Sequence, residues 1–181
     1  FYDGGKHLDF DDALNHALKM IEEGADILDI GGESARPGSC RITSEEELNK
    51  ILPVIKALSG KIDIPISCDT YKAEVAVEAI KAGVSIINDI SGFSFDKELL
   101  NVLKDTGCGY VLMHMQKNPT DMQVNPFYTD VIREISEFFE TKLNFISKKG
   151  IDLKKVVLDP GIGFGKRLED NLKIIKSLDK F

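Results

Sequence analysis

Cysteine is scarce in this sequence, and its spacing excludes the usual cysteine-based sites. Cys40, Cys68 and Cys108 are odd in number and include no C-x-x-C pair, which is the spacing that zinc sites and redox motifs use. Unpaired cysteines are typical of proteins that stay in a reducing compartment. We therefore expect three free, buried thiols and a cytoplasmic location.

Long apolar runs and an excess of positive charge are also missing. No apolar run approaches the ~20 residues of a membrane-spanning helix, and residues 1–20 contain no apolar block of the kind found in signal peptides. The 23 basic residues are outnumbered by 30 acidic ones, which gives a net charge of −7. Because nucleic-acid-binding domains favour basic faces, we expect no nucleic-acid partner. Because no long apolar run is present, we expect no membrane partner. A small anionic ligand held by a few local cations remains compatible with this charge.

Histidine is too sparse to build a metal cage. His7, His16 and His114 include no pair with metal-ligand spacing, so we expect no metal site within these residues. The sequence also offers no Ser/His/Asp arrangement that would supply a nucleophile.

A glycine-rich stretch, VVLDPGIGFGK at 156–166, lacks the spacing of the common nucleotide motifs. Pro160 stands where a Walker A loop needs its first glycine, and Arg167 stands where it needs a hydroxyl residue. The glycines follow the pattern G-x-G-x-G, whereas the dinucleotide fingerprint requires G-x-G-x-x-G. The stretch therefore predicts a strand-to-helix loop whose glycines adopt positive φ.

What the sequence does contain is a regular alternation of strand and helix patterns. An apolar content of 43% supports a core, and the length predicts one domain that spans 1–181. Apolar runs without polar alternation predict buried strands at 25–32, 64–70, 84–89, 109–115 and 155–161. Helical patterns occupy 10–23, a segment from residue 44, 71–82, 96–105, 127–149 and 169–178.

Local signals place some helix ends. Ser44 with Glu47 predicts a capping box, and Thr70 predicts the N-cap of the helix at 71–82. Pro53 predicts a kink in the second helix.

Strict alternation predicts a parallel sheet covered by helices, as a doubly wound sheet or as a (β/α)8 barrel. Every expected strand finishes on polar residues, namely Asp29, Asp69, Asn88 with Asp89, His114 and Asp159. All strand ends of a barrel ring one mouth, whereas an open sheet uses only its switch point. We therefore predict α/β class and a partial TIM (β/α)8 barrel, with about five strands and six helices. Because a barrel needs about 250 residues, one strand is expected before residue 1 and two after Phe181.

The polar strand ends suit a flat, nitrogen-rich ligand. Asp69 and Asp159 each offer a carboxylate that accepts two parallel hydrogen bonds, and Asn88 offers both a donor and an acceptor. The guanidine-like edge of a pterin or guanine matches such groups. The alternative for each acid is that it caps the following helix.

The segment GGESARPGS at 31–39 predicts a mobile loop that closes over a ligand. Arg36 suits a phosphate oxygen or a stacked aromatic ring. The alternative is a solvated surface arginine.

Six motifs follow one another over essentially all 181 residues, namely FYDGG, DILDIGGESARPGS, PISCDT, IINDISG, MHMQKNPTDMQ and LDPGIGFGK. Together they resemble the ordered motifs of the dihydropteroate synthase family. The resemblance implies a TIM barrel and a transferase of folate synthesis. Such an enzyme condenses 6-hydroxymethyl-7,8-dihydropterin diphosphate with 4-aminobenzoate, which sulfonamides mimic, to give 7,8-dihydropteroate and diphosphate.

The resemblance also implies roles for particular residues. It assigns the pterin to Asp69, Asn88, Asp159 and Met113, and it places Lys166 outside the pterin pocket.

The first two loops would form the aminobenzoate and diphosphate side through Phe1, Arg36 and Pro37. Ala35 stands where the family usually has threonine, so one hydroxyl contact to the substrate is expected to be absent.

The resemblance implies Mg²⁺ as cofactor, with its protein ligand expected before residue 1 and no metal ligand within the chain. A pterin-binding lysine and the diphosphate-binding residues are expected after Phe181. The chain alone is therefore expected to hold half a site and to be inactive, and the full-length parent is expected to be a homodimer that acts on small molecules.

Two other interpretations stay open. One is the pterin-binding domain of a corrinoid-dependent methyltransferase, against which the ESARPG loop argues because a methyl-folate site needs no diphosphate-facing loop. The other is a non-catalytic barrel that binds a ligand or supports a fused folate enzyme.

Overall fold

Five short strands form one parallel sheet in the computed structural model, which describes residues 9–36 and 38–181. They are β1 (Leu28–Gly31), β2 (Ile66–Asp69), β3 (Ile86–Asp89), β4 (Gly109–Met113) and β5 (Val156–Asp159). Their order in the sheet follows the chain without a reversal. A doubly wound sheet reverses its strand order at the switch point, whereas neighbours in a (β/α)8 barrel follow the chain. The predicted partial barrel is therefore confirmed.

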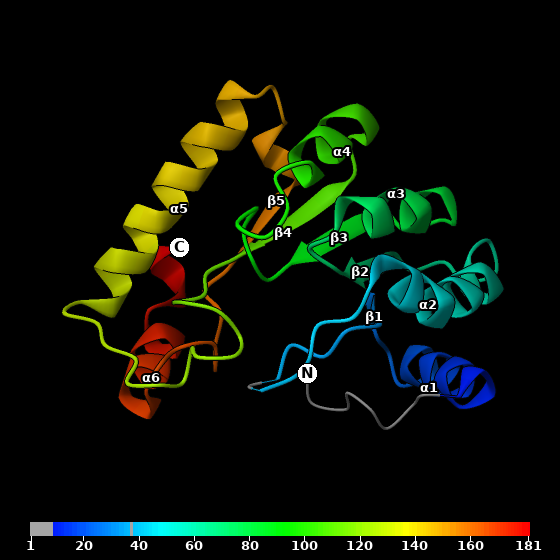
Figure 1. Ribbon diagram of the computed structural model, residues 1–181, viewed down its shortest axis with the longest axis horizontal. Coiled ribbons are helices and arrows are strands. Elements are labelled where there is room, and N and C mark those ends of the chain that lie inside the picture. Colours follow the sequence, from blue (N-terminus) through cyan, green and yellow to red (C-terminus); the bar gives the residue numbers. More distant parts are fainter. Residues whose placement is uncertain (1–8, 37) are drawn as a thin grey trace.

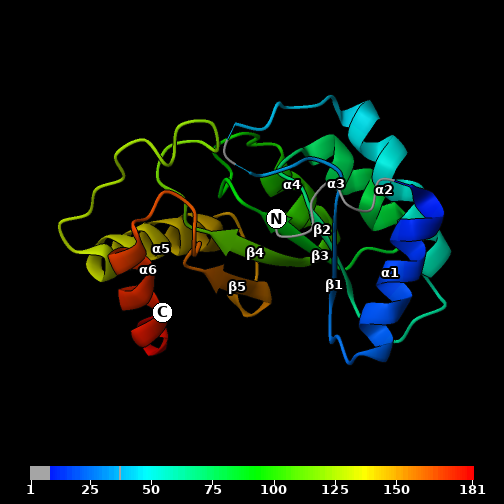
Figure 2. The ribbon, with the colours of Figure 1, turned by 90° about the horizontal axis from the view of Figure 1, so that it is seen from below.

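Helices surround the outside of the curved sheet (Figure 1). The described chain contains α1 (Phe10–Glu22), α2 (Ser44–Leu58), α3 (Ala73–Lys81), α4 (Leu99–Thr106), α5 (Val131–Lys148) and α6 (Leu168–Lys176), with the 3-10 turns η1 (Leu153–Lys155) and η2 (Leu178–Lys180). The loops that follow β1 and β4 approach one another at one end of the sheet (Figure 2). Among the helices of the described residues, none combines the length and the apolar character that crossing a membrane requires.

The alternation of side chains along each strand separates two faces of the sheet. The outer face lies under the helices and contributes fully buried residues to the main core, such as Leu28, Cys68, Ile87 and Leu112. The side chains at the alternate positions of the same strands point to the inner face. Strand register aligns Gly31, Asp69, Asn88, Val111 and Val157 across all five strands.

Asn88 and Asp89 illustrate this separation at the end of β3. Asp89 is fully buried on the helix side, where its carboxylate accepts hydrogen bonds from the backbone of Ser91 and Phe93 and from the Tyr110 hydroxyl. Asp89 therefore fixes the loop that follows β3, and Asn88 alone faces the inside of the sheet at this point.

The capping box of α2 lies one residue earlier than predicted. Thr43 and Glu46 form it, with Glu46 Oε2 accepting from the Thr43 backbone at 2.8 Å. The predicted partner, Glu47, is 1% exposed and binds Lys72 instead. The helix continues through Pro53 to Leu58.

The N-cap of α3 also differs from the prediction. The helix starts at Ala73, and the Asp96 carboxylate, from the loop after β3, accepts the Ala73 N–H at 2.8 Å. Thr70 accepts only the Lys72 N–H, at 3.2 Å. A cap from another part of the chain leaves no local sequence signal, which explains the wrong prediction.

Candidate functional site

Asp69 and Asn88 lie side by side on the inner face, at the ends of β2 and β3. Gly31 makes room for them, because a Cβ at its position would be 3.1 Å from the Asp69 Cβ. Asn88 Nδ2 donates to Asp29 Oδ2 at 2.9 Å, while the buried Asn88 Oδ1 finds no hydrogen-bond partner among the described residues. A carboxyl group therefore stands next to an amide oxygen that has no hydrogen-bond partner among the described residues.

The electrostatic surroundings of Asp69 favour its neutral form. Burial, followed by the nearby Asp29 carboxylate, raises the pKa of Asp69 to about 8. A ligand that donates hydrogen bonds to the carboxylate favours the ionised form instead.

Asp159 and Met113 form the next row of the inner face, where they pair in register. Asp159 Oδ1 accepts the Gly161 N–H at 2.7 Å, which fixes the carboxylate at the start of the glycine-rich loop. Met113 is buried in a small cluster with Ile90, Met122 and Phe164. The inner face thus offers a carboxylate beside an apolar patch.

The glycine-rich loop packs against the chain that leaves β4. Gly161, Gly163 and Gly165 all have positive φ, at 70°, 83° and 62°, which confirms the predicted conformation. A Cβ at Gly161 would lie 2.0 Å from the His114 carbonyl oxygen, and one at Gly165 would lie 2.8 Å from the Gln116 carbonyl oxygen. The first and third glycines are therefore required by close backbone contact.

Lys166 ends this loop as a buried residue. Its Nζ donates to the carbonyl oxygens of His114 and Phe164, at 3.2 and 2.9 Å. Burial lowers the pKa of Lys166 to about 7, although Asp159 and Asp170 act in the opposite direction. The side chain joins the end of β4 to the glycine-rich loop.

His114 does not join the ring of polar strand ends that the sequence predicts. It follows Met113, so the alternation turns its side chain towards α5, where it meets the Phe138 ring edge-on at 4.9 Å. Burial lowers the pKa of His114 to about 3. The His114 imidazole is therefore a neutral side chain that packs in the outer layer.

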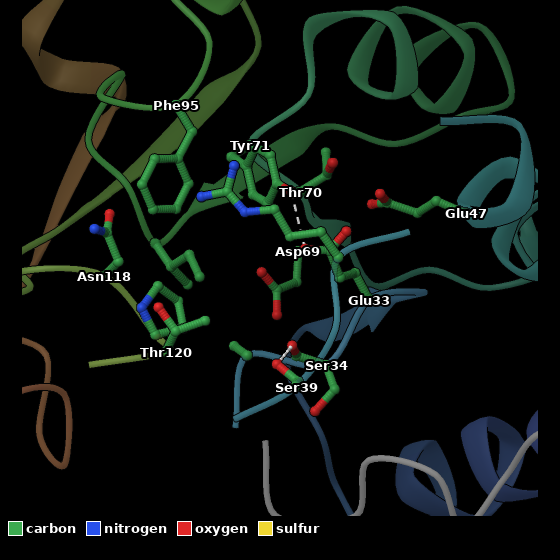
Figure 3. A pocket seen from close by; sticks show the side chains of 14 residues that line it. Glu33, Ser34, Ser39, Glu47, Asp69, Thr70, Tyr71, Phe95, Asn118 and Thr120 are labelled. Atoms are coloured by element: carbon green, nitrogen blue, oxygen red, sulfur yellow. Dashed lines mark hydrogen bonds between the residues drawn. The ribbon is translucent and has the colours of Figure 1, made fainter. Parts of the chain in front are cut away.

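A cavity of about 330 Å³ opens beside Asp69, between the loops that follow β1, β2, β3 and β4 (Figure 3). Its lining includes Glu33, Arg41, Asp69, Tyr71, Phe95 and Asn118. Asn88, Met113 and Asp159 lie outside this lining, on the inner face of the sheet. The predicted pterin residues thus share one face, while only Asp69 reaches the cavity.

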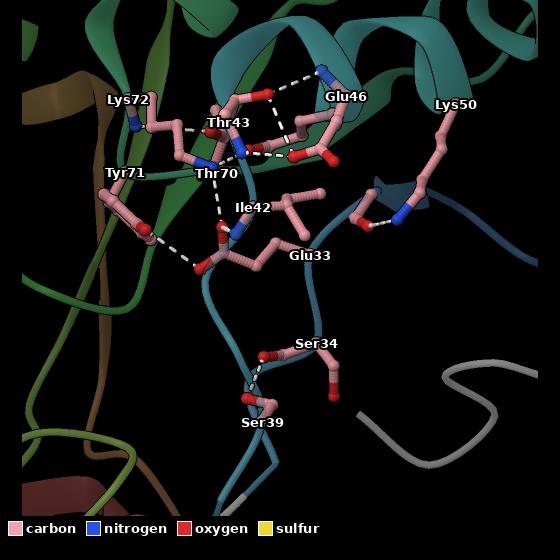
Figure 4. A network of polar contacts seen from close by, with 12 residues as sticks. Glu33, Ser34, Ser39, Ile42, Thr43, Glu46, Lys50, Thr70, Tyr71 and Lys72 are labelled. Carbon is pink, nitrogen blue, oxygen red and sulfur yellow. Dashed lines mark hydrogen bonds and ion pairs between the residues drawn. The ribbon is translucent and has the colours of Figure 1, made fainter.

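A polar network forms one wall of the cavity (Figure 4). Glu33 accepts hydrogen bonds from the Tyr71 hydroxyl at 2.9 Å, from Lys72 Nζ at 2.6 Å and from the Ile42 N–H at 3.1 Å. Lys72 Nζ also binds Glu47 Oε2 at 2.5 Å. Although burial acts to raise it, these hydrogen bonds hold the pKa of Glu33 below its usual value.

The sequence did not single out Lys72, and it singled out Glu47 only as part of a capping box, whereas the network depends on the pairing of these two residues. Lys72 lies 39 residues from Glu33 and 25 from Glu47. The available signal was a charged residue three positions after Asp69, which alone is more often a solvated lysine.

The loop between β1 and α2, which we call the second loop, brings Arg41 to the cavity. The arginine singled out from the sequence was Arg36. Arg36 is exposed and, among the described residues, does not belong to the cavity lining, whereas Arg41 does. The Arg41 guanidinium lies 4.3 Å from the centre of the Phe95 ring. Phe1 and Pro37, which complete the predicted aminobenzoate side, fall outside the described residues.

Metal binding finds no support in the described part of the chain. Within residues 9–36 and 38–181, no group of three or more His, Cys, Asp or Glu side chains could hold a metal ion.

Comparison with known proteins points to one family. The model of the pterin binding enzyme family matches residues 1–181. Dihydropteroate synthase from Escherichia coli strain K12 is 43% identical over 181 residues, which is 100% of this chain and 64% of that protein. The chain therefore spans about 64% of the length of this curated relative.

Solved structures show the same likeness. Yersinia pestis dihydropteroate synthase, in a complex with a sulfonamide drug, superposes with a TM-score of 0.94 at 41% identity, covering 98% of this chain and 64% of that one. Xanthomonas albilineans dihydropteroate synthase in complex with 7,8-dihydropteroate gives a TM-score of 0.83 at 37% identity, covering 98% and 62%.

Proposed function

Because this chain belongs to the pterin binding enzyme family, we propose that it forms the pterin-binding part of a dihydropteroate synthase. The reaction condenses 6-hydroxymethyl-7,8-dihydropterin diphosphate with 4-aminobenzoate. The products are 7,8-dihydropteroate and diphosphate. The observation that carries the proposal is the placement of Asp69, Asn88 and Asp159 on the inner face at three strand ends, in a chain 43% identical to a dihydropteroate synthase.

The pterin is proposed to lie against the inner face of the sheet. Asp69 and Asp159 accept hydrogen bonds from its ring N–H and amino groups, since a carboxylate takes two parallel N–H donors. The unpartnered Asn88 Oδ1 accepts a further one, and Asp29 holds the Asn88 amide in this orientation. Met113, buried beside Asp159, packs against the ring.

The reaction needs no nucleophilic side chain. The C–O bond between the pterin methylene and the diphosphate breaks, and the diphosphate leaves with the electron pair. The amine nitrogen of 4-aminobenzoate then forms a C–N bond with the methylene carbon and releases its proton to solvent. Carboxylates near the ring favour the positive charge that develops on it. The chain's task is therefore to bind and orient the pterin.

Further residues of the chain are proposed to bind the second substrate and the diphosphate. Phe1, Arg36 and Pro37 would form the aminobenzoate and diphosphate side. Mg²⁺ has no ligand set among residues 9–36 and 38–181. We also propose that residues 1–181 form one pterin-binding domain. The full-length parent is proposed to be a cytoplasmic homodimer that acts on small-molecule substrates.

The test measures incorporation of labelled 4-aminobenzoate by the intact gene product, with and without Asp159→Asn. We expect the substitution to raise the pterin substrate KM and to lower turnover, with a combined loss of about 1.5–3 kcal/mol for one charged hydrogen-bonding partner. Asp105→Asn, an exposed change on α4, is the matched control and should leave both constants unchanged.

Two outcomes would contradict the proposal. Unchanged kinetics for Asp159→Asn would remove Asp159 from the site. No incorporation by the folded wild-type protein would exclude the synthase, and methyl-folate binding would then separate a methyltransferase domain from a non-catalytic barrel.

A further inference from the structure

Arg41 is the one cationic side chain in the lining of the cavity, as far as the described residues show. The other charged residues of the lining are the carboxyl groups of Glu33, Glu47 and Asp69. The cavity therefore combines an acidic wall with a single guanidinium.

A different residue, Lys72, already pairs with the two glutamates of the acidic wall. Lys72 Nζ lies 2.6 Å from Glu33 Oε2 and 2.5 Å from Glu47 Oε2. Arg41 makes no ion pair within the part of the chain that the structure describes; its recorded neighbours are two aromatic rings. The positive charge of Arg41 is thus left for a ligand.

Two aromatic rings hold this charge at one side of the cavity. The Arg41 Cζ lies 4.3 Å from the Phe95 ring centre and 5.4 Å from that of Tyr71, and the two rings meet edge-on at 5.1 Å. A guanidinium that stacks by its face keeps the N–H groups at its edge available. Those N–H groups match the two oxygens of a carboxylate or a phosphate.

The backbone next to Arg41 is also held in place. The Ile42 N–H donates to Glu33 Oε2 at 3.1 Å, so the network that contains Lys72 closes the base of the second loop. Arg41 therefore extends from an anchored point of the loop, whereas Arg36 lies on its exposed part.

We propose that Arg41 is a specificity-determining residue that binds an oxyanion of the substrates at the loop side of the cavity. The proposal rests on the proposed function and deepens it. That reaction supplies two oxyanions, the carboxylate of 4-aminobenzoate and the diphosphate of the pterin substrate. Both have the chemistry that a forked guanidinium recognises, and the experiment distinguishes them.

The experiment compares the wild-type intact gene product with Arg41→Met, Arg41→Lys and the control Arg133→Met, an exposed change on α5. Steady-state kinetics give separate KM values for 4-aminobenzoate and the pterin diphosphate, and 4-aminobenzamide serves as a neutral analogue of the arylamine. Thermal unfolding shows that each variant is folded.

If Arg41 binds the carboxylate of 4-aminobenzoate, Arg41→Met should raise the KM for 4-aminobenzoate about tenfold and leave the KM for 4-aminobenzamide unchanged. A diphosphate at Arg41 predicts the same rise in the KM of the pterin substrate, together with weaker inhibition by pyrophosphate. Arg41→Lys should recover part of the loss, because it restores charge without the planar fork. Changes below twofold in both KM values would overturn the proposal.

A binding experiment separates this proposal from the proposed function. Should the folded wild-type protein make no dihydropteroate, the synthase fails, and calorimetric titration with 4-aminobenzoate and with pyrophosphate still tests Arg41. Binding of either anion that Arg41→Met weakens about tenfold and Arg133→Met leaves unchanged would support the oxyanion site. Equal affinities, or no binding of either anion, would overturn it.

Discussion

The Asp69 carboxyl group makes the stability of the fold depend on pH. Burial and the nearby Asp29 raise the pKa of Asp69 from 3.8 to about 8, so the folded protein keeps a proton that the unfolded chain has lost at neutral pH. Since the unfolded state then binds fewer protons than the folded state, this group's contribution to stability decreases as pH rises from about 4 to about 8.

The first prediction follows from this sign. Urea unfolding of the wild-type protein between pH 4 and 8 should show a decrease in the free energy of unfolding that Asp69→Asn lacks, with a slope of at most about 1.4 kcal/mol per pH unit. Asp105→Asn, which alters an exposed carboxylate of α4, should keep the wild-type slope. Parallel pH profiles for the wild-type protein and Asp69→Asn would contradict the raised pKa.

A second prediction at this scale uses two glycines of one loop. Gly161 and Gly163 have similar φ, 70° and 83°, yet a Cβ at Gly161 would meet the His114 carbonyl oxygen at 2.0 Å while one at Gly163 meets nothing within 4 Å. Gly163→Ala should therefore lose only the conformational term of about 1–2 kcal/mol. Gly161→Ala should lose more than about 3 kcal/mol, because backbone has to move. Equal losses in urea unfolding would show that the loop does not pack against β4 as described.

At the scale of elements, Lys72 joins the loop after β1 to α2 and to the start of α3. Its side chain is 13% exposed, as is that of Glu33, and Glu47 is 1% exposed. Among the described residues Lys72 is the cation that pairs with Glu33 and Glu47. Its removal leaves two carboxylates without a positive partner in a largely buried place, which is more costly than losing a surface ion pair.

The third prediction concerns this network. Lys72→Met should lower the free energy of unfolding by about 3 kcal/mol. Lys81→Met breaks an exposed pair with Glu78 on the same helix and should cost no more than about 1 kcal/mol. Chemical denaturation of both variants provides the comparison, and similar losses in the two would mean that the network contributes little.

The positions of the elements could be predicted from sequence, because apolar periodicity and chain order are local signals. The α2 helix, for example, begins at Ser44, within one residue of the start that the sequence predicts with Ser44 as the cap. The capping of α2 and α3 could not be predicted as well. Ser44 and Thr43 both suit an N-cap, and only the burial of Glu47 against Lys72 decides between them. The Asp96 cap of α3 comes from a different loop.

The candidate site follows the same division. Strand ends predicted Asp69, Asn88 and Asp159, since parallel strands finish at the same edge. The alternation then decides which neighbour faces inwards, and it turns His114 and Asp89 away. Arg41 was missed because its position depends on contact with Phe95, 54 residues later in the chain.

At the scale of the whole molecule, the three cysteine thiols differ in their exposure to solvent. Cys40 is exposed, Cys108 is half-buried and Cys68 is fully buried, so the expectation of three buried thiols is wrong for Cys40 and Cys108. Cys40 lies on the loop between β1 and α2. Burial raises the pKa of both Cys68 and Cys108, which lowers their reactivity, since the thiolate is the reactive form.

The fourth prediction is an order of labelling with a thiol reagent. Iodoacetamide at neutral pH should modify Cys40 first and Cys108 more slowly, while Cys68, beneath the helices, should react only when the fold opens. Mass spectrometry over time measures the order, and urea should accelerate Cys68 far more than Cys40. Early modification of Cys68 in the native protein would contradict the packing of α3 against the sheet.

The placement of Asn88 and Asp89 on opposite faces of β3 has a consequence for how genes of this kind can change. A substitution at either position alters one face and leaves the other intact. Deletion of a single codon within the strand would exchange the two positions, burying the amide and turning the carboxylate that anchors Tyr110 towards the inner face. Evolution is therefore expected to vary the length of the loops of this protein. Its four- and five-residue strands are expected to change by substitution and not by insertion or deletion.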